Sequence, residues 1–251
     1  AQINIPRDIW TQGVDIELPE IIEFELPAGG TNAISSAAKI LSDAKFPVIL
    51  NGAGVILGNA IPASQTLAER LDSPVCCNYQ HNDAFPGSHP LFVGPLGYNG
   101  SKAAMELIKQ ADVVLALGTR LNPFSTLPGY NLDYWPNEAK LIQVDINPDR
   151  IGLTKPVTVG IVGDSKQVAE QILSRLTDSA GDAGRDVRRK LIADKKDVWA
   201  KTLASMDFEE DDPGTTWNER VRKRQPDHMS PRMVWRAIMA ALPKDAIISS
   251  D

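Results

Sequence analysis

Between residues 31 and 176 the sequence alternates helix-like and strand-like segments, and this alternation constrains the fold more than any other feature. The apolar, strand-like runs lie at residues 48–51, 75–77, 113–117, 141–145 and 157–162. Such alternation is typical of a parallel sheet with helical crossovers. The run 113–117 is apolar throughout, which indicates that both sheet faces are covered. We therefore expect an α/β fold, a doubly wound Rossmann-like parallel sheet of five or six strands, rather than a barrel, which needs eight repeats.

The segments outside this region differ in character. Residues 185–206 predict a charged helix whose acidic and basic residues are interleaved, as expected of a solvated linker rather than a binding patch. Residues 1–6 are strand-like, and Ser230-Pro231 starts a second predicted helix, which is followed by a strand-like run at 246–250. Because these edges have no sheet of their own to join, we expect them to be severed parts of two neighbouring domains.

Composition narrows the class of ligand. The chain has 26 Lys+Arg against 32 Asp+Glu, a formal net charge of −6, which argues against nucleic acid or an anionic membrane as partner and favours small molecules. No apolar run approaches the roughly 20 residues of a membrane span, and the first residues do not resemble a signal peptide. Cys76 and Cys77 predict buried free thiols, which fits a cytoplasmic protein.

Ligands of a doubly wound sheet bind beyond the carboxyl ends of its strands, so the loops there hold the candidate residues. Gly52 and Gly54 permit close approach to a phosphate or a flavin-like ligand, but a plain tight turn is an equal alternative, because Gly58 is one position late for the dinucleotide fingerprint. Arg120 could bind a phosphate or carboxylate, or pair with a neighbouring acid. Asp145 could accept from ribose hydroxyls, or cap the turn that follows it.

The loop at residues 78–90 carries two of the three histidines. His81 could face a substrate, whereas His89, which precedes Pro90, is expected to fix the loop. The spacing of these histidines and of the adjacent cysteines does not match structural zinc sites, so we predict no metal site. The sequence contains no nucleophile elbow, P-loop or H-E-x-x-H motif, and therefore no self-contained catalytic constellation.

Several motifs together resemble the central domain of thiamine-diphosphate-dependent enzymes of the acetolactate synthase and pyruvate oxidase superfamily. They include Gly118-Thr119-Arg120, Gln143-Val144-Asp145-Ile146 and Val162-Gly163-Asp164. The resemblance implies four segments. Residues 1–30 would be the end of a pyrimidine-binding domain and a linker, 31–178 the central Rossmann-like domain, 179–229 a linker with a charged helix, and 230–251 the start of a diphosphate-binding domain.

Longer motifs resemble one family within that superfamily, the sulfoacetaldehyde acetyltransferases. They lie at residues 76–87, 97–102, 120–130 and 212–220. The resemblance implies conversion of sulfoacetaldehyde and phosphate to acetyl phosphate and sulfite in taurine degradation, with thiamine diphosphate and Mg²⁺ as cofactors, in a cytoplasmic homo-oligomer. Alternatives are an acetolactate synthase-like carboligase, an oxalyl-CoA decarboxylase-like enzyme and a stand-alone nucleotide-binding module.

The resemblance also limits what these residues can do alone. The family's catalytic glutamate and Gly-Asp-Gly motif are absent, so we expect an inactive fragment that does not hold thiamine diphosphate tightly. Asp251 would lie at the edge of the cofactor site in the full enzyme, and His81 and Asn82 would be substrate contacts. Gly52, Gly54, Arg120 and Asp145 match positions that hold FAD or ADP in some relatives. Because the acetyltransferase chemistry requires no flavin, FAD or ADP is possible here but not favoured. The alternatives are a vestigial pocket, a nucleotide-regulated one or a purely structural one, and the last two together are preferred to a flavin site.

Overall fold

The computed structural model describes residues 4–22, 25–205, 231–243, 246 and 248. The predicted strand at 246–250, the residue Asp251 and the predicted helix cap Ser230 therefore lie wholly or largely outside the described residues. Of the expected charged helix, the structure describes residues 185–205, and the helix that follows Ser230 is described from Pro231.

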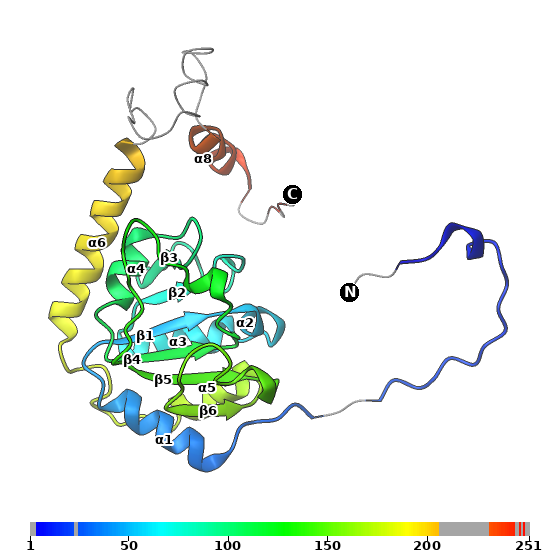
Figure 1. Cartoon of the computed structure of the whole chain (residues 1–251), viewed down its shortest axis with the longest axis horizontal. Helices are drawn as coiled ribbons and strands as arrows, with labels where there is room; N and C mark the ends of the chain where they lie inside the picture. Colours follow the sequence, from blue (N-terminus) through cyan, green and yellow to red (C-terminus); the bar gives the residue numbers. More distant parts are fainter. Residues whose placement is uncertain (1–3, 23–24, 206–230, 244–245, 247, 249–251) are drawn as a thin grey trace.

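A six-stranded parallel sheet forms the centre of the molecule (Figure 1). Its strands are β1 (Pro47–Asn51), β2 (Val75–Cys77), β3 (Phe92–Pro95), β4 (Val113–Leu117), β5 (Lys140–Asp145) and β6 (Val159–Val162). Their spatial order is β3-β2-β1-β4-β5-β6, and every neighbouring pair is parallel. This is the usual strand order of the Rossmann fold. The predicted α/β doubly wound class is therefore confirmed.

From β1 the chain first adds β2 and β3 on one side, and it then returns to add β4, β5 and β6 on the other side. Because the direction of winding reverses, helices cover both faces of the sheet. The helices are α1 (Thr31–Ser42), α2 (Ala53–Leu57), α3 (Ile61–Leu71), α4 (Lys102–Ile108), α5 (Ser165–Leu173), α6 (Arg185–Ser205) and α8 (Pro231–Ala241). Helix α5 packs against α1 and α3, and α4 packs against α6. The central strands β1 and β4 are buried at every residue, which is the covered, two-faced environment that their apolar sequences indicate.

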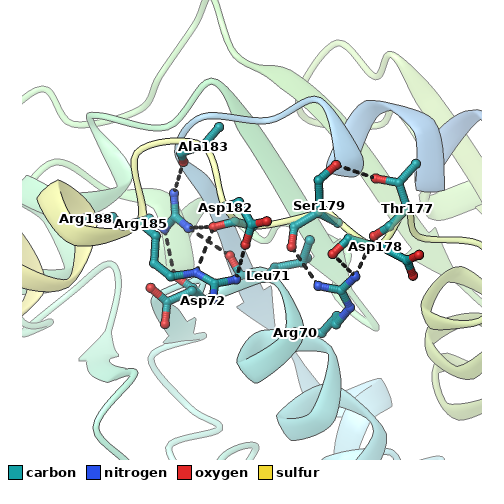
Figure 2. Close-up of polar contacts among 12 residues, drawn as sticks. Arg70, Leu71, Asp72, Thr177, Asp178, Ser179, Asp182, Ala183, Arg185 and Arg188 are labelled. Atoms are coloured by element: carbon teal, nitrogen blue, oxygen red, sulfur yellow. Dashed lines mark hydrogen bonds and ion pairs between the residues drawn. The ribbon is translucent and has the colours of Figure 1, made fainter.

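Two arginines fix the start of α6 to the domain (Figure 2). Arg188 is fully buried and donates to five backbone carbonyl oxygens, those of Lys45, Leu71, Asp72, Gly181 and Ala183, at 2.6–3.0 Å. Arg70 donates to the carbonyl oxygens of Thr177, Asp178 and Ala180. Since Leu71 is the last residue of α3, Arg188 also satisfies carbonyls at the end of that helix.

Further along, α6 contacts the domain through side chains near its surface. Lys195 forms an ion pair with Glu106 at 2.7 Å, and Trp199 makes an edge-to-face contact with Tyr130. Among its described residues, Arg188 and Ile192 are buried. Helix α6 thus contacts the domain along one side, and most of its side chains are exposed or only partly buried.

The amino-terminal residues 4–22 extend away from the sheet (Figure 1), and their apolar side chains, including those of Trp10 and Ile21, are exposed. Within the described part of the chain, no helix combines the length and apolarity needed to cross a bilayer.

The adjacent thiols of Cys76 and Cys77 make stability depend on pH. Both are free and buried in β2; burial raises the pKa of Cys76 and raises the pKa of Cys77 to about 12. Thiols of the unfolded chain ionise near pH 8.5, so above that pH the unfolded state loses protons that the folded state keeps. We expect the free energy of unfolding in urea to fall from about pH 8 to pH 10, by up to about 1.4 kcal/mol per pH unit for each thiol.

The control is a chain in which both cysteines are replaced by alanine, measured at the same pH values. Its free energy of unfolding should vary less over this interval than that of the unchanged chain. Equal slopes for the two proteins would contradict the assignment.

Candidate nucleotide cleft

A cleft of about 500 Å³ opens at the carboxyl edge of the sheet, where the strand order reverses between β1 and β4. Crevices at this point are the usual ligand sites of doubly wound sheets. The lining of the cleft includes Gly54, Asn78, His81, Arg120, Asp145, Arg150, Asp164 and Ser165. Four residues selected from the sequence, Gly54, His81, Arg120 and Asp145, are therefore brought together.

Glycines bring the loops after β1 and β4 into backbone contact. The Gly54 amide donates to the Gly118 carbonyl oxygen at 2.9 Å. A Cβ atom on Gly54 would lie 2.7 Å from Gly118 Cα, and one on Gly52 would lie 2.5 Å from the Gly118 carbonyl oxygen. Gly54 lines the cleft and Gly52 does not. Both glycines serve the close contact with Gly118, and a ligand contact at either stays a prediction.

Gly58, the late third glycine, has a different neighbour. A Cβ atom there would lie 2.7 Å from Oδ2 of Asp164, the residue that caps α5 by accepting from the amides of Lys166 and Gln167. Gly58 also lines the cleft, and its lack of a side chain leaves room for this carboxylate.

Arg120 and Asp145 both lie in the cleft wall, and each answers a question left open by the sequence. Arg120 is exposed and forms no ion pair with a described carboxylate, so the predicted alternative of a paired arginine is not what the structure shows. Asp145 Oδ1 accepts from the amide of Asn147 at 2.9 Å. Asp145 therefore caps its turn and lines the cleft at once.

The loop after β2 contributes His81 to the cleft, while Asn82 lies outside the lining. The Asn82 side chain bonds instead to the Tyr79 carbonyl oxygen of its own loop. His89 is held at both ring nitrogens, by Glu69 at 3.0 Å and by the amide of Leu91, and so fixes the loop as expected. Asn78, at the start of the loop, donates to Thr119 Oγ1, and its own Oδ1 is buried without a described partner.

Two residues of the lining, Arg150 and Ser165, and the neighbouring Gln143 were not selected from the sequence as site residues. Arg150 lies on the short 3₁₀ helix Pro148–Arg150, Ser165 begins α5, and Gln143 is buried in β5 just beneath the lining. A polar residue inside an otherwise apolar strand is the signal that could have marked Gln143, because a buried amide must be hydrogen-bonded.

The described residues provide no group of three or more His, Cys, Asp or Glu side chains that could hold a metal ion. The cleft is lined by glycine backbone, by amides, by the arginines Arg120 and Arg150, and by the aspartates Asp145 and Asp164.

Residues 34–172 match the family described as "Thiamine pyrophosphate enzyme, central domain". The chain belongs to this family. A solved structure of a thiamin diphosphate-dependent enzyme from Mycobacterium smegmatis, so described, superposes with a TM-score of 0.52 at 23% identity, covering 63% of this chain and 30% of that one, and supports the fold alone.

Curated relatives match this thiamine pyrophosphate enzyme domain at different levels of identity. A sulfoacetaldehyde acetyltransferase from Roseovarius nubinhibens is 72% identical over all 251 residues, which span 42% of that relative. One from Castellaniella defragrans is 45% identical and also matches the whole chain, at 42% of its own length. An acetolactate synthase from Mycobacterium leprae is 34% identical over 180 residues, 69% of this chain and 28% of that protein. The chain thus spans less than half the length of the curated relatives it matches.

Proposed function

We propose that these residues act as the central domain of a longer enzyme, a sulfoacetaldehyde acetyltransferase that converts sulfoacetaldehyde and phosphate to acetyl phosphate and sulfite. The observation that carries this proposal is the 72% identity to the Roseovarius nubinhibens acetyltransferase along the entire chain. The acetolactate synthase match is weaker and stops short of the whole chain, which makes a carboligase the second choice. We further propose a cytoplasmic homo-oligomer that acts in taurine degradation; the two free buried thiols support the cytoplasm.

The described residues do not fit thiamine diphosphate with a divalent metal. The chain lacks the Gly-Asp-Gly sequence expected of the diphosphate and metal site, and no described group of side chains could ligate Mg²⁺. In the longer enzyme, thiamine diphosphate would supply the electron sink for the acyl group. We propose that thiamine diphosphate and Mg²⁺ are held by the rest of the enzyme, near Asp251 on one side.

In this proposal the domain contributes positioning and a ligand cleft. From the loop after β2, His81 lines the cleft beside Asn78 and Gln80. We propose that His81 and, outside this lining, Asn82 serve as donors to the sulfonate or phosphate of the substrates. The unpaired Arg120 beside Gly54 and Asp145 favours a second role, the binding of a nucleotide such as ADP or FAD in the cleft.

The test of the catalytic proposal uses the protein encoded by the complete reading frame. It should release sulfite from sulfoacetaldehyde only when phosphate, thiamine diphosphate and Mg²⁺ are present, and a His81→Ala variant should raise the KM for one of the two substrates. Acetolactate formation from pyruvate without sulfite release would favour the carboligase. Calorimetry should detect no tight binding of thiamine diphosphate to the 251-residue chain, and tight binding would contradict the proposal that the rest of the enzyme holds it.

A further inference from the structure

A second cavity, of about 610 Å³, opens between α6, the end of α3 and the loop that leads into β3. Its apolar wall includes Leu91 and Ile192, both of which are buried. Its titratable side chains are those of Glu69, Asp72, His89, Arg189 and Lys196. No residue of this wall also lines the nucleotide cleft, so the cavity is separate from the site described above.

Both carboxylates of the cavity have partners in its own wall. Glu69 Oε1 lies 3.0 Å from His89 Nε2, and the Asp72 carboxylate accepts from Arg189 Nε at 2.9 and 3.0 Å. Since His89 Nδ1 accepts from the amide of Leu91, the ring donates to Glu69 through Nε2. Four of the five titratable side chains are thus paired with each other.

Lys196 is the fifth titratable side chain, and its Nζ contacts backbone. Nζ donates to the carbonyl oxygens of Pro90 at 2.8 Å and His89 at 3.4 Å, and it forms no ion pair with a described carboxylate. A neutral amine has two N–H groups and one lone pair, so two carbonyl acceptors use both N–H groups and leave the lone pair free. Partial burial lowers the pKa of Lys196, which increases the fraction of neutral amine.

Two other lysines of α6 are held as ammonium ions by carboxylates. Lys195 pairs with Glu106 at 2.7 Å, and Lys201 pairs with Asp197 at 2.6 Å. The hydrogen bond to the Asp197 carboxylate raises the pKa of Lys201. A partly desolvated lysine without a carboxylate partner is the form in which an amine acts as a nucleophile. On this helix that description fits Lys196 and does not fit Lys201.

The cavity has features that suit a small acyl phosphate, the class of compound that the proposed acetyltransferase releases. The apolar wall can accept a methyl group, and Arg189 supplies positive charge for the phosphate. The two terminal nitrogens of Arg189 have no hydrogen bond to a described residue. Arg189 and Lys196 lie seven residues apart on α6, so they share one face of the helix, with Ile192 and Ala193 between them.

We propose that Lys196 is a site of acetylation by acetyl phosphate bound in this cavity. The neutral Nζ attacks the acetyl carbon, and the C–O bond to the phosphate breaks. The leaving phosphate takes one proton of the amine as hydrogen phosphate, and an amide remains. The inference rests on the proposed function for the source of acetyl phosphate. The acetylated Nζ keeps one N–H group, so at least one of the two carbonyl contacts that join α6 to the loop before β3 is lost.

The experiment treats the 251-residue chain with acetyl phosphate at neutral pH. The remaining amines are then labelled with deuterated acetic anhydride in the unfolded state, and mass spectrometry measures the acetylated fraction of each lysine. We expect Lys196 to react about fivefold faster than Lys201 in the folded chain, and both to react at the same rate in a chain unfolded in urea. Equal rates in the folded chain would overturn the proposal. The same preference in the unfolded chain would also overturn it, because the local sequence and not the cavity would then be its cause.

A pair of variants separates the cavity from general effects of charge. Ala193 lines the cavity one turn before Lys196, and Ala193→Asp adds a carboxylate that favours the ammonium form and repels an anionic donor. This variant should slow acetylation of Lys196 about fivefold. Val187→Asp makes the same charge change at an exposed site of α6 outside the cavity, and it should leave the rate within about twofold. An Ala193→Asp chain that is acetylated at Lys196 as fast as the unchanged chain would overturn the role of the cavity.

Failure of this inference can be distinguished from failure of the proposed function, because the test supplies acetyl phosphate directly. Sulfite release by the complete enzyme is measured separately. Acetylation of Lys196 without sulfite release would keep the modification site and remove its proposed source of acetyl phosphate. Sulfite release without selective acetylation of Lys196 would overturn the inference and leave the proposed function intact.

Discussion

Replacement of Arg188 by leucine should lower the free energy of unfolding by about 3–5 kcal/mol, the loss typical of breaking a buried charged network. Arg188 is fully buried and donates to five carbonyl oxygens. Leucine fills part of the volume but leaves those carbonyls without their donors. A buried ion pair can be replaced by apolar residues when both partners change, but backbone carbonyls remain whatever the side chain. Urea unfolding followed by circular dichroism measures the loss.

Lys190 provides the control for this prediction. It lies two residues further along α6, is exposed, and forms no ion pair with a described carboxylate. Lys190→Leu should change the free energy of unfolding by no more than about 0.5 kcal/mol, as is usual for surface substitutions. Similar losses for the two variants would show that the carbonyl contacts of Arg188 do not stabilise the fold.

Gly118→Ala should lower the free energy of unfolding in urea by about 2–4 kcal/mol, from backbone strain together with overpacking. Gly118 has φ at +61°, and an added Cβ atom would lie 2.6 Å from Ser165 Oγ and 2.7 Å from Gly54 Cα. The serine hydroxyl could turn aside, but the Gly54 backbone belongs to helix α2 and lines the cleft, so it can move only if the cleft wall moves with it. We therefore expect the variant to lose ADP affinity as well as stability.

Gly152→Ala separates these two contributions. Gly152 has a similar φ, +74°, but an added Cβ atom would meet nothing within 4 Å. The Gly152→Ala variant should lose about 1 kcal/mol of unfolding free energy, from backbone strain alone. The difference between the variants measures the close approach of the two loops. If Gly152→Ala costs as much as Gly118→Ala, the contact with Gly54 has no part in stability.

The central sheet could be predicted from the sequence because its middle strands are mainly apolar. The edge strand β3 was not predicted, since Phe92–Pro95 contains a glycine at φ +100° and a proline, and its register with β2 is irregular. Strand β6 begins at Val159, two residues after the expected start. There the amide of Leu141 donates to the Thr158 side chain, while the Thr158 amide donates to the Leu141 carbonyl oxygen.

The sequence predicts those residues of the candidate site that follow strand ends or belong to glycine-rich turns. It does not predict residues whose role depends on being buried. Gly54, Arg120 and Asp145 follow strands directly, so topology alone brings them to one cleft. Arg150 follows a turn and resembles any surface arginine in sequence. Arg188 lies among the charged residues of α6, and hydrophobic periodicity cannot distinguish a buried arginine from its exposed neighbours.

The segment that leads into the domain is also part of the cleft. Leu26 lines it, the next carbonyl oxygen, that of Pro27, accepts from the amide of Asp164, and Ala28 forms a bridge with Gly163. A ligand that contacts Leu26 binds more tightly when this segment is docked, so docking and binding share one thermodynamic cycle. By reciprocity, a ligand in the cleft stabilises the docked segment and should slow its proteolysis. Anything that pulls the segment away from the domain should weaken ligand binding by the factor with which the ligand favours docking.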